Sequence, residues 1–117
     1  MDNNFSDVID KIRREMNSNE LVGATHVPTE YKECISCNIL GVKSGTTGYK
    51  GGDSGHGGRT VFKIEDLSST DLMVSINGSG YFSAKEVGIA FGGDSELSTF
   101  IQALEFTLET YKSQMKK

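Results

Sequence analysis

The sequence predicts an α+β fold: a small two-layer domain with an N-terminal helix, about four mostly antiparallel strands and a long C-terminal helix. Apolar residues recur at helical spacing near both ends of the chain. Between these segments, apolar and polar residues alternate, and glycine-rich turns separate the alternating stretches. A chain of 117 residues is long enough for one hydrophobic core, so we expect a single domain over residues 1–117.

The N-terminal helix is expected from about Phe5 to Met16. Apolar side chains recur there every three to four residues, and the opposite face is charged. Asn4 or Ser6 is suited to cap its first turn. The following segment, Leu21–Tyr31, has no clear period and is interpreted as irregular.

Four strands are expected between the two helices. The alternation places them at Lys32–Val42, Thr60–Glu65, Asp71–Asn77 and Tyr81–Phe91. Asn77 and Gly78 are typical of a tight turn between the last two.

The C-terminal helix is expected to begin after Gly92 and Gly93, where Asp94 or Ser95 is suited to cap it. Its apolar face is formed by residues three or four positions apart: Leu97, Phe100, Ile101, Leu104, Leu108, Tyr111 and Met115. Phe106 lies off this face, which indicates either a wide buried face or a subunit interface.

The segment Gly45–Thr60 is the strongest functional signal in the chain. Eight of the 14 glycines lie between Gly41 and Gly58, and polar or charged side chains are interspersed among them. Glycine lets the backbone approach a ligand closely, and successive N–H groups in such turns can bind an anion. Three basic residues and one acid give residues 43–60 a charge of +2, although the whole chain carries −4. This contrast favours a small anionic ligand over a nucleic acid.

Seven side chains of the loop form the candidate ligand-binding set: Tyr49, Lys50, Asp53, Ser54, His56, Arg59 and Thr60. Tyr49 is suited to stack on a base, and Arg59 and Lys50 are suited to bind phosphate. Asp53, Ser54, His56 and Thr60 can bond ribose hydroxyls, base amines or phosphate. The alternative is structural: Asp53 and Ser54 make turns, and Arg59 pairs with Asp53 or with Glu65.

Several other functional classes are disfavoured by the sequence. No Gly-Lys-Ser/Thr is present, and Thr60 stands where a dinucleotide-binding motif needs glycine. Gly52-Asp53-Ser54-Gly55 is like a serine-protease segment but lacks a scaffold for a triad, so no catalytic residue is assigned. Cys34 and Cys37 lie in a predicted strand and are interpreted as buried ordinary thiols. We therefore expect neither a metal nor a cofactor.

The run Thr47–Thr60, with the sequence TGYKGGDSGHGGRT, resembles a loop of small uncharacterised phage and prophage proteins. Gly92–Ile101 resembles the start of a helix in the same proteins. In general character the chain is similar to phage-encoded sponges, which sequester cyclic nucleotides or ADP-ribose-derived signals of bacterial immunity. That resemblance implies a counter-defence protein in the cytoplasm of the bacterial host cell.

We therefore expect a non-enzymatic, homo-oligomeric binding protein that sequesters a small phosphate-bearing nucleotide signal through Gly45–Thr60. Two alternatives stay open. One is a protein–protein inhibitor of a bacterial defence complex, of the anti-CRISPR type. The other is a small phosphodiesterase in which His56 and Asp53 form an acid–base pair. No membrane association is expected, because no apolar run approaches the ~20 residues that span a bilayer.

Overall fold

The computed structural model describes residues 19–52, 57–68 and 70–116. Its elements, in order, are β1 (Asn19–Val22), β2 (Thr25–Ile35), β3 (Ile39–Thr46), β4 (Arg59–Ser68), β5 (Met73–Val74), β6 (Phe82–Ser83), β7 (Glu86–Gly92) and α2 (Asp94–Met115). Strands hold 47% of the described residues and the helix 24%. The predicted fold class is therefore wrong: the described chain is mostly sheet, with one helix at its C-terminal end and no N-terminal helix. The helix predicted over Phe5–Met16 lies outside the described residues.

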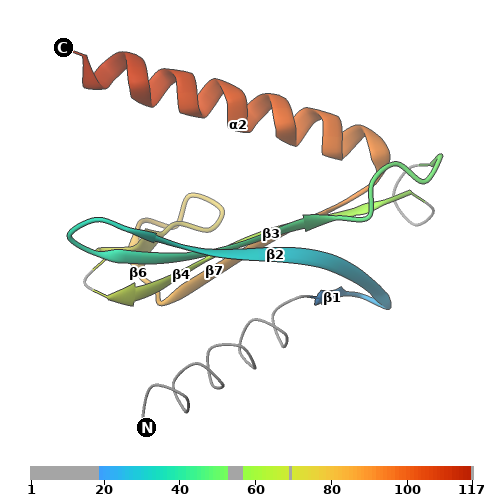
Figure 1. Ribbon diagram of the computed structural model, residues 1–117, viewed down its shortest axis with the longest axis horizontal. Helices are drawn as coiled ribbons and strands as arrows, with labels where there is room; N and C mark the ends of the chain where they lie inside the picture. The colour runs from blue at the N-terminus through green and yellow to red at the C-terminus, as the bar shows by residue number, and fades with distance from the viewer. Residues whose placement is uncertain (1–18, 53–56, 69, 117) are drawn as a thin grey trace, which may run out of the picture.

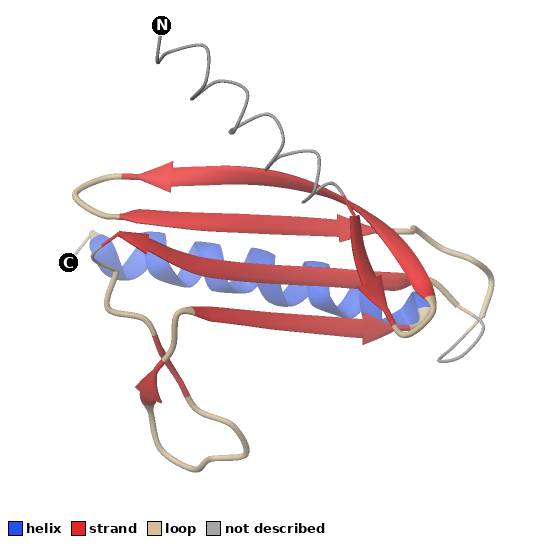
Figure 2. Cartoon of the chain, turned by 90° about the horizontal axis from the view of Figure 1, so that it is seen from below, coloured by secondary structure: helices blue, strands red, loops and turns tan. Residues whose placement is uncertain are grey.

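The main sheet has five antiparallel strands in the order β1-β2-β3-β4-β7. It is curled, because β2 bends over at its start and carries β1 across one face (Figure 2). Helix α2 runs along the opposite face (Figure 1). A separate two-stranded ribbon, β5 with β6, projects from the sheet between β4 and β7.

Two predictions for the segments before β4 are wrong, and in the first of them the turn lacks the usual glycine or proline signal. The predicted strand Lys32–Val42 is a hairpin, in which β2 and β3 pair from Ile35↔Ile39 outward. The turn between them closes with a hydrogen bond from the Ser36 N–H to the Asn38 carbonyl, 2.9 Å long. Leu21–Tyr31, predicted as irregular, contains parts of β1 and β2. Gly23, with φ 61°, permits the tight turn that joins them.

The remaining strand predictions are mixed. Thr60–Glu65 is confirmed as part of β4. Asp71–Asn77 contributes only the two residues of β5, and Tyr81–Phe91 is divided between β6 and β7. The turn at Asn77 and Gly78 is confirmed, since both have positive φ. Polar residues interrupt these segments, so the strands predicted from apolar alternation are longer than the strands that pair in the structure.

The hydrophobic core of the described chain is small. Val27, Val61 and Leu97 are its buried apolar side chains. Beside them, Phe100 of α2 packs on Phe62 and Phe91, with ring centroids 6.0 and 4.7 Å away. This aromatic contact fixes the first half of α2 on β4 and β7.

A charged network covers the face of the sheet opposite α2. Glu20 accepts hydrogen bonds from Lys43 at 2.7 Å and from Lys63 at 3.3 Å, and Lys63 also pairs with Glu86 at 3.3 Å. The hydrogen bond from Lys43 lowers the pKa of Glu20 below its usual value, although burial acts in the opposite direction. The network ties β1 to the strands beneath it.

The long C-terminal helix is confirmed, but its packing differs from the prediction. Leu97 is 8% exposed, whereas Leu104 and Leu108 are 43% and 54% exposed. Phe106 is 70% exposed, so the interpretation of a wide buried face is wrong for this chain. The cause is that α2 contacts the sheet mainly through its first turns.

Candidate functional site

The glycine loop between β3 and β4 is attached to the start of α2 through the carboxylate of Asp94. Oδ1 accepts from the backbone N–H of Lys50 at 2.9 Å and of Gly58 at 3.0 Å. Oδ2 accepts from Gly51 at 2.6 Å, from Gly52 at 3.2 Å and from Lys50 at 3.1 Å. We call these five residues the Asp94 junction. Successive N–H groups of a glycine-rich turn here form an anion-binding concavity, and the anion is a side chain of the same protein.

Backbone hydrogen bonds complete the Asp94 junction. The Asp94 N–H donates to the Gly52 carbonyl at 3.1 Å, and the Gly93 N–H donates to the Gly58 carbonyl at 2.8 Å. Gly93, with φ 129°, occupies the N-cap position and offers no side-chain cap. The prediction that Asp94 or Ser95 caps the helix is therefore wrong. Asp94 is the first helical residue, and its side chain points to the loop instead.

Two glycines show why this loop needs its composition. Gly51 has φ 88°, a conformation that side chains with a Cβ rarely adopt. At Gly58, an added Cβ would lie 2.1 Å from the Gly48 carbonyl oxygen and 2.7 Å from Thr47 Oγ1. Glycine at these positions allows the loop to fold back on itself and present its N–H groups to Asp94.

The Asp94 junction holds its carboxylate in the charged form. Backbone hydrogen bonds, first from Lys50 and then from Gly58, lower the pKa of Asp94 to about 2. The N–H groups of Lys50, Gly51, Gly52 and Gly58 thus serve an internal anion. The anion site that the loop composition predicts is present, but Asp94 fills it.

The seven predicted ligand-binding residues fall into three groups. Asp53, Ser54 and His56 lie outside the described residues. Tyr49 and Lys50 lie beside the start of α2: the Tyr49 hydroxyl is hydrogen-bonded to Ser98 Oγ, and Tyr49 as a whole is 62% exposed. Arg59 and Thr60 form the third group, at the start of β4.

Arg59 and Thr60 point to opposite faces of the sheet, as adjacent strand residues do. Arg59 Nη1 donates to the carbonyls of Gly57 at 3.2 Å and Gly58 at 3.1 Å, and its guanidinium lies against Gly92 of β7. Thr60 is buried, and its hydroxyl is 2.9 Å from Thr46 Oγ1 on the α2 side. The structure therefore brings Tyr49, Lys50 and Thr60 toward α2 and separates Arg59 from them.

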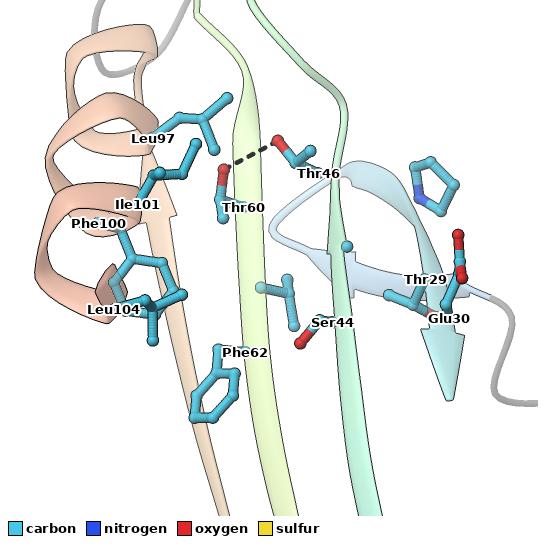
Figure 3. Close-up of a pocket in the computed structure, with 13 residues that line it drawn as sticks. Thr29, Glu30, Ser44, Thr46, Thr60, Phe62, Leu97, Phe100, Ile101 and Leu104 are labelled. Atoms are coloured by element: carbon cyan, nitrogen blue, oxygen red, sulfur yellow. Dashed lines mark hydrogen bonds between the residues drawn. The ribbon is translucent and has the colours of Figure 1, made fainter. Parts of the chain in front are cut away.

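A groove between α2 and the sheet begins next to Thr60, with a volume of about 560 Å³. Its walls come from β2, β3, β4 and α2: Pro28, Thr29, Glu30, Ser44, Gly45, Thr46, Thr60, Val61, Phe62, Leu97, Phe100, Ile101 and Leu104. Figure 3 shows the α2 side chains facing Thr60 and Phe62, with the Thr46–Thr60 hydrogen bond at one end. The walls are mainly apolar, so the groove suits an apolar or aromatic group.

Sequence reasoning missed both the groove and the role of Asp94. The groove is assembled from strands that are distant in the sequence, and the β2–β3 hairpin that supplies one wall was predicted as a single strand. Asp94 did have a signal, because an acid follows Gly92-Gly93 and a second glycine-rich segment offers many unpaired N–H groups. That signal was interpreted as a helix cap.

The cysteines and acids offer no metal site in the described chain. Cys34 and Cys37 are free thiols and both are exposed, so their predicted burial is wrong. Across residues 19–52, 57–68 and 70–116, no three His, Cys, Asp or Glu side chains are placed to hold a metal ion. In the same ranges, no helix is both long enough and apolar enough to cross a membrane.

In comparisons with protein-family models, curated proteins and solved structures, nothing matches this chain.

Proposed function

We propose that this chain is a non-enzymatic binding protein that sequesters a small phosphate-bearing nucleotide signal through the Gly45–Thr60 loop. The Asp94 junction is the observation that carries the proposal. Five hydrogen bonds from the loop backbone to one carboxylate fix Lys50–Gly52 and Gly58 before any ligand arrives. Backbone segments that are already held in place lose less conformational entropy on binding, so more of the contact energy appears as affinity.

Tyr49 is the proposed stacking platform for a base. Its hydroxyl is hydrogen-bonded to Ser98 of α2 while the residue stays exposed, an arrangement that offers a flat face at low entropic cost. Lys50, next in the chain, is exposed and supplies positive charge for a phosphate. Thr60, at the end of the groove, offers a hydroxyl to a group that enters it.

Arg59 has a smaller role in this proposal than its residue type suggests. It lies on the other face of the sheet and bonds the carbonyls of Gly57 and Gly58, so it supports the loop as well as adding charge. Asp53, Ser54 and His56 remain proposed ligand contacts because their side chains can bond ribose hydroxyls, base amines or phosphate. The resemblance of Thr47–Thr60 to phage proteins supports a counter-defence role in a bacterial host, with an immune signal as the ligand.

The first test is to identify by mass any nucleotide that is retained through purification, and to titrate cyclic dinucleotides and cyclic ADP-ribose isomers by calorimetry. Tyr49→Ala should weaken binding about 5- to 150-fold, as expected for loss of one base–aromatic stack. Tyr49→Phe and Ser98→Ala are matched controls, because each removes the hydroxyl contact but keeps the ring. Both should change affinity only a few-fold.

Two results would contradict the proposal. One is that no member of the panel binds the wild type. The other is that Ser98→Ala weakens binding as much as Tyr49→Ala, which would assign the effect to loop structure and not to stacking. If the ligand is recovered in cleaved form, the chain is a phosphodiesterase and not a binding protein.

A second candidate function is a protein–protein inhibitor of a bacterial defence complex. The exposed apolar side chains of α2, such as Leu108 and Tyr111, favour it because such surfaces mark sites of protein association. A defence assay in host cells separates the two candidates. An inhibitor should lose activity in Leu108→Glu and keep it in Tyr49→Ala, whereas a nucleotide-binding protein should lose activity in Tyr49→Ala.

A further inference from the structure

The apolar face of α2 is progressively uncovered toward the C-terminus. Leu97 is 8% exposed, whereas Leu104, Leu108, Tyr111 and Met115 are 43%, 54%, 61% and 82% exposed. These residues lie on one side of the helix, because they are three or four positions apart. Figure 1 shows the reason: α2 moves away from the sheet along its length, so that its two ends lie at different heights above the strands. We call Leu104, Leu108, Tyr111 and Met115 the apolar stripe.

The space beside the apolar stripe is not filled by other described parts of the chain. The groove between α2 and the sheet has Leu104 as its last helical wall residue. On the sheet, Ile89 of β7 is 42% exposed. A contiguous apolar surface of this kind in a water-exposed chain marks a contact site.

Charged residues along one edge of the apolar stripe indicate which partner fits. Glu105, Glu109, Lys112 and Lys116 are spaced four, three and four residues apart, so they lie on the same flank of α2. The two acids come first along the helix and the two bases come last. If two copies of α2 pack antiparallel about a two-fold axis, each acidic half lies beside the basic half of the other copy. A parallel two-fold pair would put the two charged flanks on opposite sides of the pair, where their opposite charges do not meet.

We propose that a second copy of this chain covers the apolar stripe. The two α2 helices pack antiparallel with their stripes in contact, Leu104 lies beside Met115 of the other copy, and Leu108 lies beside its Tyr111. The partner's helix also closes the open side of the groove. This inference goes beyond the proposed function and is independent of it, because it depends on the helix and not on the glycine loop.

The position of β1 favours a second copy over the N-terminal segment as the occupant. Residues 1–18 join the described chain at β1, which lies on the face of the sheet opposite α2 (Figures 1 and 2). The opposed charges of Glu105 and Glu109 against Lys112 and Lys116 are, in addition, self-complementary under two-fold symmetry.

Light scattering on the full chain tests the assembly. The wild type should have the mass of a dimer, and Leu108→Glu should halve it while circular dichroism shows the helix retained. Phe106→Glu is the matched control: it introduces the same charge into the same helix on the opposite side, where Phe106 is 70% exposed, and should leave the dimer intact. A monomeric wild type, a Leu108→Glu dimer, or equal dissociation by Phe106→Glu would each overturn the proposal.

Cysteine cross-linking tests the antiparallel arrangement. In a background of Cys34→Ser and Cys37→Ser, copies with Leu104→Cys are mixed with copies that carry Met115→Cys and are oxidised. The antiparallel pair should give mainly the mixed disulfide dimer, and Leu104→Cys alone should give little. Dimers from Leu104→Cys alone, without the mixed species, would indicate parallel helices and overturn the arrangement. No cross-link in either sample would overturn it as well.

Discussion

The two halves of α2 carry the same repeat of apolar residues, but they lie in opposite environments. In the first half, Leu97 is buried and Phe100 contacts two aromatic rings of the sheet. In the second half, Tyr111 and Met115 are mostly exposed. The first half also begins at the Asp94 junction, which attaches it to the loop between β3 and β4.

This difference shows that contacts at one end can position a helix that buries few side chains along the rest of its length. The Asp94 junction and the Phe100 contacts both act near the start of α2, so the start is fixed and the remainder extends away from the sheet (Figure 1). The apolar side chains of the second half are then exposed and available for contact with another molecule. A repeat of apolar residues specifies the side of the helix that will be covered, but not what covers it.

The comparison predicts its largest effect at Leu97. Leu97→Ala removes a buried side chain and leaves a cavity, so it should lower the free energy of unfolding by about 2–5 kcal/mol. Urea denaturation followed by circular dichroism measures this loss. A loss below about 0.5 kcal/mol would mean that the first half of α2 is not fixed by packing.

The next effect is expected at Asp94. Asp94→Asn removes the negative charge that four backbone residues bind, and it places an amide donor opposite N–H groups of the loop. We expect Tm to fall by about 5–10 °C. Amide hydrogen exchange should accelerate at Gly51 and Gly58 and remain unchanged at Val61, which serves as the internal control. Exchange that rises equally at all three would argue against a local role.

Acid should weaken the Asp94 junction selectively. The pKa of Asp94 in the folded chain is about 2, below its usual value of 3.8. A lowered carboxyl pKa contributes stability that is complete above the unfolded pKa and is lost as pH falls toward the folded one. The Tm difference between wild type and Asp94→Asn should therefore be constant above about pH 5 and shrink between pH 4 and pH 2. If the Tm difference does not depend on pH, the destabilisation by Asp94→Asn comes from the changed hydrogen-bonding geometry and not from the lost charge.

The smallest effect on the isolated chain is expected in the second half of α2. Leu108→Ala deletes atoms from a side chain that is 54% exposed, so it should lower the stability of a monomer by less than about 1 kcal/mol. In the proposed dimer, the same substitution should reduce stability more as protein concentration rises. Thermal unfolding at two concentrations, a hundredfold apart, separates these two contributions.

Local sequence correctly indicated the elements whose signals are local. The long helix from Asp94 follows from apolar spacing, β4 from alternation, and the turn at Asn77–Gly78 from residues that tolerate positive φ. The glycines of Gly45–Thr60 also indicated turns whose N–H groups can bind an anion, and in the structure they bind Asp94; the predicted external ligand stays a prediction. In each case a few neighbouring residues contain the physical cause.

The tertiary structure decided which anion the loop binds and how much of α2 is covered. Asp94 lies 36 residues after Gly58, and only the pairing of β4 with β7 brings the two together. The opposite directions of Arg59 and Thr60, the hairpin hidden in Lys32–Val42 and the exposure of Leu108 likewise depend on strand register and on where α2 leaves the sheet. The sequence by itself determined the loop, the long helix and its apolar face, because backbone preference and periodicity are local properties. Their partners are set by contacts between distant segments, which no local pattern specifies.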